Sequence, residues 1–473
     1  MLYESPPARG QDRRLLLLSY HFAPSQRIGA IRWQKFACAL AERGWALDVV
    51  TLEPEAKPDD GFAGLPAGIR VFGVPDPTPL LVRMERRAGS MMRALRNGSD
   101  AAPTHTEPAT ALSYRRETVP RAELRWRLHS PSGAHKTYVA ARLLFYQLRW
   151  ALRAERVARR LLARNSYEGV IASGPPHMVY EAGRRAAGRA GVPFVMDMRD
   201  SWSVCRIVHH GVATPLWFTV ARSFEAVAVR AADLVVVNTE LFREAMIDRY
   251  PGAAPRFVTI RNGWDDEPVP RAPRRERFTI MFSGTLYHGR DPRPLFRAVA
   301  RVVQDLGIGP DRLGITLMGD VEQFAGVPTL HAAREAGVDG YVTVTPWRSR
   351  QDAAAEQASA SMLVSLPWPE DLSVPGKIYD YMRYDAWILV FAPPHSAPAR
   401  LLGDSGVELV APDDVNGAAR IIRSRFEAFM AGARPRRLAD ERFSRRREAN
   451  RLLAALDGLS RRADRPLSRR GAA

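Results

Sequence analysis

Short apolar runs that alternate with helical patterns are the feature of this sequence that most limits its possible folds. The first run, 15–19, leads into a Pro/Gly loop, a helical pattern that ends at Gly44, and a second run at 47–52. Three further runs lie at 169–174, 193–197 and 233–238. Short strands that alternate with helices favour a parallel sheet covered by helices on both faces.

A second series of apolar runs begins after a stretch rich in proline and charge at 265–277. Its members lie at 278–284, 314–318, 342–344, 362–365, 388–391 and 407–410. A chain of 473 residues is too long for one core of usual size, so this stretch is expected to be a linker. The sequence therefore predicts two doubly wound α/β domains, 1–265 and 277–440, that face a central cleft.

Three segments stand outside these two series. Residues 75–135 have a polar composition without a clear period, which predicts an insertion with a partly disordered loop. A long helical pattern rich in arginine follows at 138–164. At the end of the chain we expect a helix over 441–460 and a basic tail over 461–473.

The positive charge of the chain is concentrated in a few places. The formal net charge is +18, and residues 121–164 hold eleven Arg or Lys against Glu123 and Glu155. This excess predicts an anionic partner, either nucleic acid, an acidic membrane surface or a phosphorylated substrate. Nucleic acid is disfavoured because no recognition motif or aromatic platform accompanies the charge. An anionic membrane surface in contact with 121–164 is the partner that we expect besides the substrates.

Several common classes of protein are disfavoured by missing signals. There is no Walker-type loop, no G-x-G-x-x-G after a strand, no G-x-S-x-G and no His/Cys cluster at metal-ligand spacing. No metal and no bound cofactor are therefore expected. Two cysteines, Cys38 and Cys205, and the lack of a long apolar run favour a cytoplasmic protein, peripheral on a membrane at most.

Ligands of open parallel sheets bind beyond the carboxyl ends of the strands, and candidate residues follow several of the predicted strands. Gly284, with Thr285, would let a diphosphate approach the backbone, and Arg290 would pair with a phosphate. The structural alternatives are that Gly284 forms a tight turn and that Arg290 is a solvated surface charge. Pro375 and Gly376 precede a helix, so backbone N–H groups and Lys377 would face an anion there.

Other candidates have equally ordinary alternatives. Asp380 could bind ribose hydroxyls or form a surface ion pair with Lys377 one turn earlier. In the first domain, one predicted strand ends at Asp197, Arg199 and Asp200. These residues would act in catalysis, or Arg199 would form a structural ion pair with a carboxylate. Gly29 and His177 follow other strands, and a lone histidine is more often structural than catalytic.

Seven segments share their order and spacing with one known family. They are LAERGW (40–45), SGPPH (173–177), DMRDSW (197–202), ADLVVVNT (232–239), RNG (261–263), GTLYHGR (284–290) and PGKIYDY (375–381). With them the chain resembles the retaining glycosyltransferases of family 4, whose two Rossmann-like domains form the GT-B fold. The resemblance covers most of residues 14–456.

The resemblance implies a function and a role for each candidate residue. The second domain would hold a nucleotide-sugar, which is a substrate and not a cofactor, and the sugar would pass to a polysaccharide or lipid-linked acceptor with retention of configuration and without metal. Arg290 and Lys377 would clamp the diphosphate and Asp380 the ribose. The further implied positions are Gly284, Thr285, Pro375, Gly376 and Ile378 for the donor, Arg199 and Asp200 for catalysis, and Gly29, His177 and Asp197 on the acceptor side.

The chain departs from the family pattern at three places. Leu372, beside Asp371, stands where the first residue of an acidic pair is usual, and Asp380 replaces the usual glutamate. Asp385 and Trp387 replace a glycine and a proline after the helix. Because of these departures, an alternative function stays open: the chain would be a non-catalytic or epimerase-like homologue that binds a sugar nucleotide.

Overall fold

The computed structural model describes most of the two predicted domains. It covers residues 1–463 except 9, 26–27, 55–61, 63, 77–132, 201, 205–213, 271–275, 287–289, 325 and 367–371. Most of the predicted insertion at 75–135, together with Cys205, Asp371 and 464–473 of the tail, therefore lies outside the described residues.

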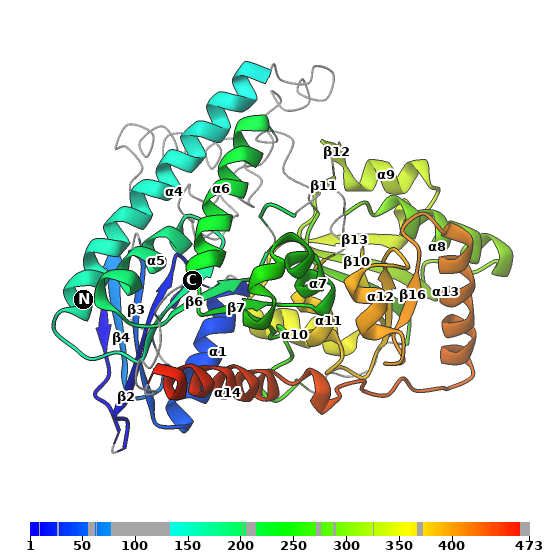
Figure 1. Cartoon of the computed structure of the whole chain (residues 1–473). Helices are drawn as coiled ribbons and strands as arrows, with labels where there is room; N and C mark the ends of the chain where they lie inside the picture. The colour runs from blue at the N-terminus through cyan, green and yellow to red at the C-terminus, as the bar shows by residue number, and fades with distance from the viewer. Residues whose placement is uncertain are drawn as a thin grey trace, which may run out of the picture.

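The N-terminal half is built on an eight-stranded sheet (Figure 1). Its strands are β1 (Tyr3–Glu4), β2 (Arg13–Ser19), β3 (Trp45–Leu52), β4 (Ile69–Val74), β5 (Gly169–Gly174), β6 (Phe194–Met198), β7 (Leu234–Val237) and β8 (Phe257–Thr259). The order across the sheet is β1-β4-β3-β2-β5-β6-β7-β8, and every pair is parallel except β1 with β4. The strand order reverses between β2 and β5.

A second parallel sheet forms the C-terminal half. Its strands are β9 (Phe278–Thr285), β10 (Leu313–Asp320), β13 (Val342–Thr345), β14 (Met362–Ser365), β15 (Trp387–Phe391) and β16 (Glu408–Val410). The order is β13-β10-β9-β14-β15-β16, which reverses between β9 and β14. A small hairpin, β11 (Gln323–Phe324) and β12 (Val327–Pro328), stands apart from it.

Helices connect the strands of both sheets. In the first half they are α1 (Ile28–Glu42), α4 (Gly133–Leu162), α5 (Val179–Ala190), α6 (Pro215–Ala231) and α7 (Glu240–Arg249). In the second half they are α8 (Arg293–Leu306), α9 (Thr329–Glu335), α10 (Arg350–Ser359), α11 (Gly376–Tyr381), α12 (Ala397–Leu402), α13 (Val415–Met430) and α14 (Arg445–Ala463). Short 3-10 turns lie at 251–256, 339–341 and 441–443.

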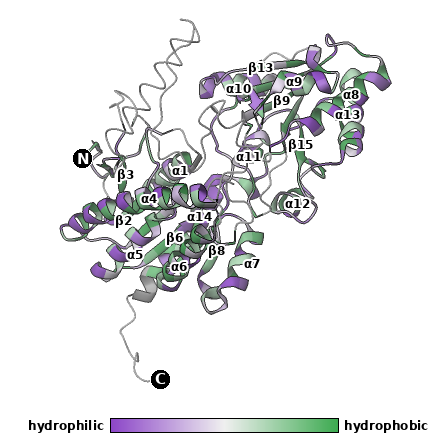
Figure 2. Cartoon of the chain, turned by 90° about the horizontal axis from the view of Figure 1, so that it is seen from above, coloured by the Kyte–Doolittle hydropathy of each residue, from purple (hydrophilic) through white to green (hydrophobic). Residues whose placement is uncertain are grey.

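Alternation of apolar side chains along each strand gives every sheet two buried faces. In β2, Leu16 and Leu18 pack with α4, α5 and α6, whereas Leu15 and Leu17 pack with α1 and α14. The second sheet is covered in the same way, with α8 and α13 on one face and α11 and α12 on the other. Figure 2 shows the hydrophobic strands between helices of mixed character. The predicted fold class, two doubly wound α/β domains, is confirmed.

The chain crosses between the two halves twice, and the two crossings are paired. Trp264 and Ser444 form a β-bridge, and the Trp264 N–H donates to the Phe443 carbonyl at 2.9 Å. Arg445 at the start of α14 holds Asp265 through contacts of 2.7 and 2.8 Å. Gly263 has φ +67°, and a Cβ there would lie 2.8 Å from the backbone of Arg445. After this crossing α14 packs against α1 of the first half.

None of the helices in the described part of the chain combines the length and the apolar character that crossing a bilayer requires.

Candidate functional site

The predicted site residues gather at the two places where the strand order reverses. In doubly wound sheets these points leave a crevice at the carboxyl ends of the strands, where ligands bind. In the second sheet, Gly284 is the last residue but one of β9, and the loop to Lys377 follows β14. In the first sheet, Ser19 ends β2 and the loop with His177 follows β5.

Lys377 reaches from α11 to the end of β9. Its ammonium donates to the Ser283 carbonyl at 2.7 Å and lies 3.9 Å above the centre of the Phe282 ring. Burial, and then the nearby charge of Arg290, lower the pKa of Lys377 well below its ordinary value. Two cations are thus held close together at one strand end, an arrangement that an anion would stabilise.

Two glycines lie side by side at the same strand ends. Gly284 has φ +142°, and a Cβ there would lie 2.6 Å from the Lys377 ammonium. Its register partner in β10, Gly319, has φ +122°, and a Cβ there would lie 2.2 Å from the Gly284 carbonyl oxygen. Sequence reasoning did not include Gly319 in the site, although a second glycine at the end of an adjacent strand was the available signal.

The alternative of an ion pair between Lys377 and Asp380 does not hold, since both residues are described and no such contact joins them. Burial raises the pKa of Asp380, and Arg445 at the interdomain crossing is the charge that most opposes this rise. The helix that carries both residues has only six residues, less than two turns, so its dipole is small. The charge at the site therefore comes from side chains more than from the N-terminus of α11.

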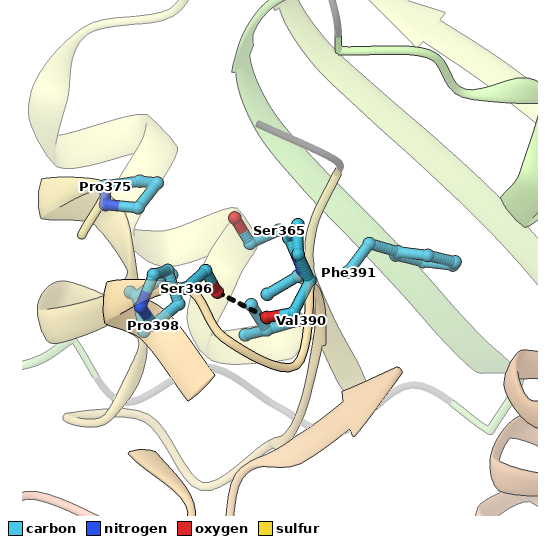
Figure 3. Close-up of a pocket in the computed structure, with 9 residues that line it drawn as sticks. Ser365, Pro375, Val390, Phe391, Ser396 and Pro398 are labelled. Atoms are coloured by element: carbon cyan, nitrogen blue, oxygen red, sulfur yellow. Dashed lines mark hydrogen bonds between the residues drawn. The ribbon is translucent and has the colours of Figure 1, made fainter. Parts of the chain in front are cut away.

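A small pocket lies beside this cluster, at the ends of β14 and β15 (Figure 3). Two predicted donor-site residues, Pro375 and Ile378, line it together with Ser365 and Pro398. Ser396, in its wall, caps α12 and donates to the Pro393 carbonyl at 2.6 Å. Thr285, the last residue of β9, is half-buried. Donor contacts from these residues remain predictions.

The first-domain candidates form a second cluster around Arg199. One of its Nη atoms donates to the Pro175 carbonyl at 2.7 Å, and another would overlap a Cβ placed on Gly29. Gly29 is therefore needed for the guanidinium to lie against the start of α1. The expected ion pair of Arg199 with a neighbouring carboxylate is absent from the described residues. Burial raises the pKa of Asp200, and the charge of Arg199 opposes it.

Asp197 lies in a buried network of hydrogen bonds and one ion pair. Its side chain is 2% exposed, accepts hydrogen bonds from Ser173 at 2.7 Å and the Trp33 indole at 2.9 Å, and lies 3.5 Å from the Arg32 guanidinium. Arg32 in turn donates to the Ile260 carbonyl at 2.9 Å. This network joins α1 to the ends of β5, β6 and β8. The structural ion pair of this segment is therefore formed by Asp197 with Arg32, a partner that sequence reasoning did not anticipate, and not by Arg199.

The His177 side chain is buried and packs as an aromatic ring. It stacks on Trp202 with ring centroids 4.8 Å apart, and its Nε2 lies 3.3 Å from the Asp200 carbonyl. Burial, and secondarily the charge of Arg199, lower the pKa of His177 to about 3. The ring is therefore neutral near pH 7.

This lowered pKa predicts a loss of stability in mild acid. The unfolded chain binds a proton on His177 near pH 6.5 whereas the folded chain does not, so the free energy of unfolding falls as the pH drops below about 6.5. Between pH 8 and pH 5 the loss should be about 2 kcal/mol. Denaturant unfolding of the unmodified chain and of H177F at both values measures it, because phenylalanine can stack on Trp202 and does not titrate. An equal loss in H177F would contradict the assignment.

Leu372 connects the donor-side loop to the first domain, a contact that sequence reasoning missed. Its side chain packs against the hydrophobic cluster that contains Trp202 and Phe242, and its carbonyl accepts the hydroxyl hydrogen of Thr239. Thr239 also caps α7 by accepting from the Phe242 N–H at 3.0 Å. A carboxylate at position 372 would meet apolar side chains, which is a physical reason for leucine here.

If Thr239 holds this loop, T239V should loosen a segment of the opposite domain. We expect amide hydrogen exchange over 372–378 to accelerate roughly five- to tenfold, since one hydrogen bond contributes about 1 kcal/mol. T214V is the matched control because Thr214 caps α6 in the same way, accepting from Trp217. Equal acceleration over 372–378 in both variants would show that Thr239 acts only as a helix cap.

The remaining departures from the family pattern lie away from the two clusters. Asp385 is an exposed partner of Arg437, at 3.2 Å, and Trp387 packs against Phe278 with ring centroids 6.0 Å apart. In the described part of the chain, no group of three or more His, Cys, Asp or Glu side chains is placed to hold a metal ion.

The two parallel sheets, each covered by helices on both faces, have the arrangement of the GT-B fold, and comparison with solved structures agrees. Sucrose-phosphate synthase from Thermosynechococcus elongatus is similar over 95% of this chain and 98% of its own, with 14% identity and a TM-score of 0.56. HepE of Anabaena, solved with UDP-glucose, is similar over 95% and 99%, with 15% identity and a TM-score of 0.53.

A trehalose-phosphate synthase (UDP-forming) from Burkholderia xenovorans, solved with glucose-6-phosphate, is similar over 94% of this chain and 100% of its own, with 12% identity and a TM-score of 0.53. At these identities the likeness shows the fold alone. No protein-family model and no curated protein matches the sequence.

Proposed function

We propose that this chain is a glycosyltransferase that moves a sugar from a nucleoside-diphosphate sugar to a polysaccharide or lipid-linked acceptor. The observation that carries the proposal is the position of Lys377, buried beside Arg290 with a lowered pKa at the point where the second sheet reverses its strand order. A cation in this environment favours a bound anion, because the anion restores the charge state that burial disfavours. One structural neighbour was solved with UDP-glucose, a nucleoside-diphosphate sugar, and another with glucose-6-phosphate, which supports phosphorylated sugars as the ligands of this site.

The chemistry of such a site concentrates on the leaving group. The bond between the anomeric carbon and the diphosphate oxygen breaks, a new bond forms to the acceptor hydroxyl oxygen, and the hydroxyl proton passes to the departing diphosphate. Negative charge therefore develops on the diphosphate in the transition state, where Lys377 and Arg290 stabilise it. A Cβ at Gly284 would lie 2.6 Å from the Lys377 ammonium, so the absence of a side chain there leaves the diphosphate room to approach that ammonium.

The acceptor would enter from the first domain. Arg199, Asp200 and Gly29 meet at the ends of β5 and β6 and the start of α1, and Asp200 has the raised pKa of a carboxyl that can exchange a proton. His177 supports this cluster by stacking and not by acid–base chemistry. In this proposal the transfer retains configuration and requires no metal.

Product analysis tests the proposal. The purified chain is incubated with a panel of nucleotide-sugars and with glycan and lipid-linked acceptors, and the products are identified by mass spectrometry and anomeric NMR. We expect release of nucleoside diphosphate and an α-linked product from α-linked donors, unchanged by EDTA. Conversion of the donor sugar to its epimer without transfer would favour the epimerase-like alternative. Binding of no nucleotide-sugar in the panel would overturn the proposal.

A further inference from the structure

The outer face of α4 carries arginine and aromatic side chains and no carboxylate. The residues of this face, named here the α4 stripe, recur at spacings of three, four and seven and so lie along one side of the helix: Tyr138, Arg142, Phe145, Arg149, Arg156 and Arg160. Tyr138 is 61% exposed and Phe145 is 55% exposed. Arg142 lies 5.9 Å from the ring of Tyr138, and Arg149 lies 5.5 Å from that of Phe145.

The opposite face of α4 is buried, and this determines the direction in which the α4 stripe points. Ala140, Leu143 and Trp150 are buried in the first-domain core, so the stripe must point away from it. Glu155 is the one acidic residue in the sequence of this helix, and it is 4% exposed. It pairs with Arg185 at 3.1 Å and with Arg189, both on α5, so it does not neutralise the stripe.

Apolar exposure continues on the neighbouring helix. α6 runs beside α4 (Figure 1), and the two helices are in contact. Leu216 and Val227 of α6 are each 39% exposed. Four of the exposed large hydrophobic residues in the described part of the chain therefore lie on these two helices. Exposed aromatic side chains that lie next to cations on one helix face indicate a surface that binds a partner.

We propose that the α4 stripe docks the chain on an anionic lipid surface, which goes beyond the proposed transfer reaction and does not depend on it. The stripe runs roughly 33 Å in a straight line, so all its members can touch a plane at once. Arginine heads would contact lipid phosphates while Tyr138 and Phe145 enter the headgroup layer. Exposed aliphatic side chains on α6 fit a lipid interface better than the grooves of a nucleic acid, which are read mainly by polar contacts.

Vesicle flotation of the full chain tests the docking surface. We expect it to float with vesicles made of equal parts phosphatidylglycerol and phosphatidylcholine, and much less with phosphatidylcholine alone or at high salt. R142Q/R149Q should weaken binding to the anionic vesicles roughly 25-fold, or about fivefold for each arginine. Y138A/F145A should weaken binding to both kinds of vesicle.

The control for loss of two positive charges is R297Q/R301Q, which removes two exposed arginines from one face of α8 in the other domain. It should float like the unmodified chain, as should K377A, so failure of the donor site and failure of the docking surface are distinguishable. Far-UV circular dichroism establishes that each variant is folded. Equal flotation of R142Q/R149Q and R297Q/R301Q would overturn the proposal, as would binding of a DNA duplex through the stripe with no affinity for vesicles.

Discussion

Replacing Lys377 with alanine should weaken binding of nucleoside diphosphates by roughly 10- to 100-fold, because a charge-assisted hydrogen bond contributes about 1.5–3 kcal/mol. The loss in kcat/KM for transfer should be larger, on the order of 100- to 1,000-fold, since charge on the diphosphate grows in the transition state. Isothermal titration with a panel of nucleoside diphosphates measures the first effect and initial rates measure the second.

Arg301, an exposed arginine of α8, supplies the control for loss of a positive charge from the same domain. R301A should bind and turn over donor as the unmodified chain does. If K377A also kept its affinity for every nucleoside diphosphate, the donor site would have to lie elsewhere.

The lowered pKa of Lys377 adds a pH dependence to this prediction. An anion binds the protonated ammonium, so binding raises the pKa of Lys377 again and takes up protons when the free lysine is partly neutral. Affinity should therefore fall as the pH rises through the lowered pKa of the free chain. K377R should have a flatter profile, because arginine stays protonated across this range.

Replacing Asp197 with alanine should cost about 3–5 kcal/mol of stability, because Arg32 would remain buried without its carboxylate. Arg32 is 2% exposed, and the same change removes the acceptor for Ser173 and for the Trp33 indole. For a domain of this size the expected fall in Tm is on the order of 10 °C. Thermal unfolding followed by circular dichroism measures it.

D248A, which removes an exposed carboxylate from α7 of the same domain, should leave the Tm nearly unchanged. D197N should fall between the two, since an amide oxygen can still accept one hydrogen bond. A normal Tm in D197A, together with a raised KM for acceptor, would instead return Asp197 to the acceptor site.

The strands could be predicted wherever an apolar run was long and clearly bounded. β5 and β14 begin and end at the predicted residues, 169–174 and 362–365, because every residue of both runs is buried in the core. β4 was not predicted, since Arg70 and Gly73 interrupt its apolar pattern. β8 has three residues, too few to show a period. The local pattern gave the exact bounds of β5 and β14 because burial is continuous along these two strands.

The function of individual charges was harder to predict than the strands. The sequence pattern assigned the same two alternatives, catalysis or a structural ion pair, to three neighbouring residues: Asp197, Arg199 and Asp200. In the fold, Asp197 is buried in an ion pair, whereas Arg199 and Asp200 lie at the edge of the site. The difference arises because β6 ends at Met198: Asp197 is still held within the sheet under the packed helices, whereas Arg199 and Asp200 lie in the loop that follows.

The sequence by itself determined the two-domain α/β fold, and it marked the segments around Gly284 and Lys377 to which we assign the donor. Both follow from apolar periodicity and from glycine and charge at strand ends, which are local properties of the chain. The tertiary structure alone decided that Lys377 bonds to Ser283, that Gly319 lies against Gly284, and that Leu372 docks on Thr239. These contacts join residues that lie between 35 and 133 positions apart in the sequence. The burial that sets the pKa of a side chain and its role exists only once those distant segments are packed together.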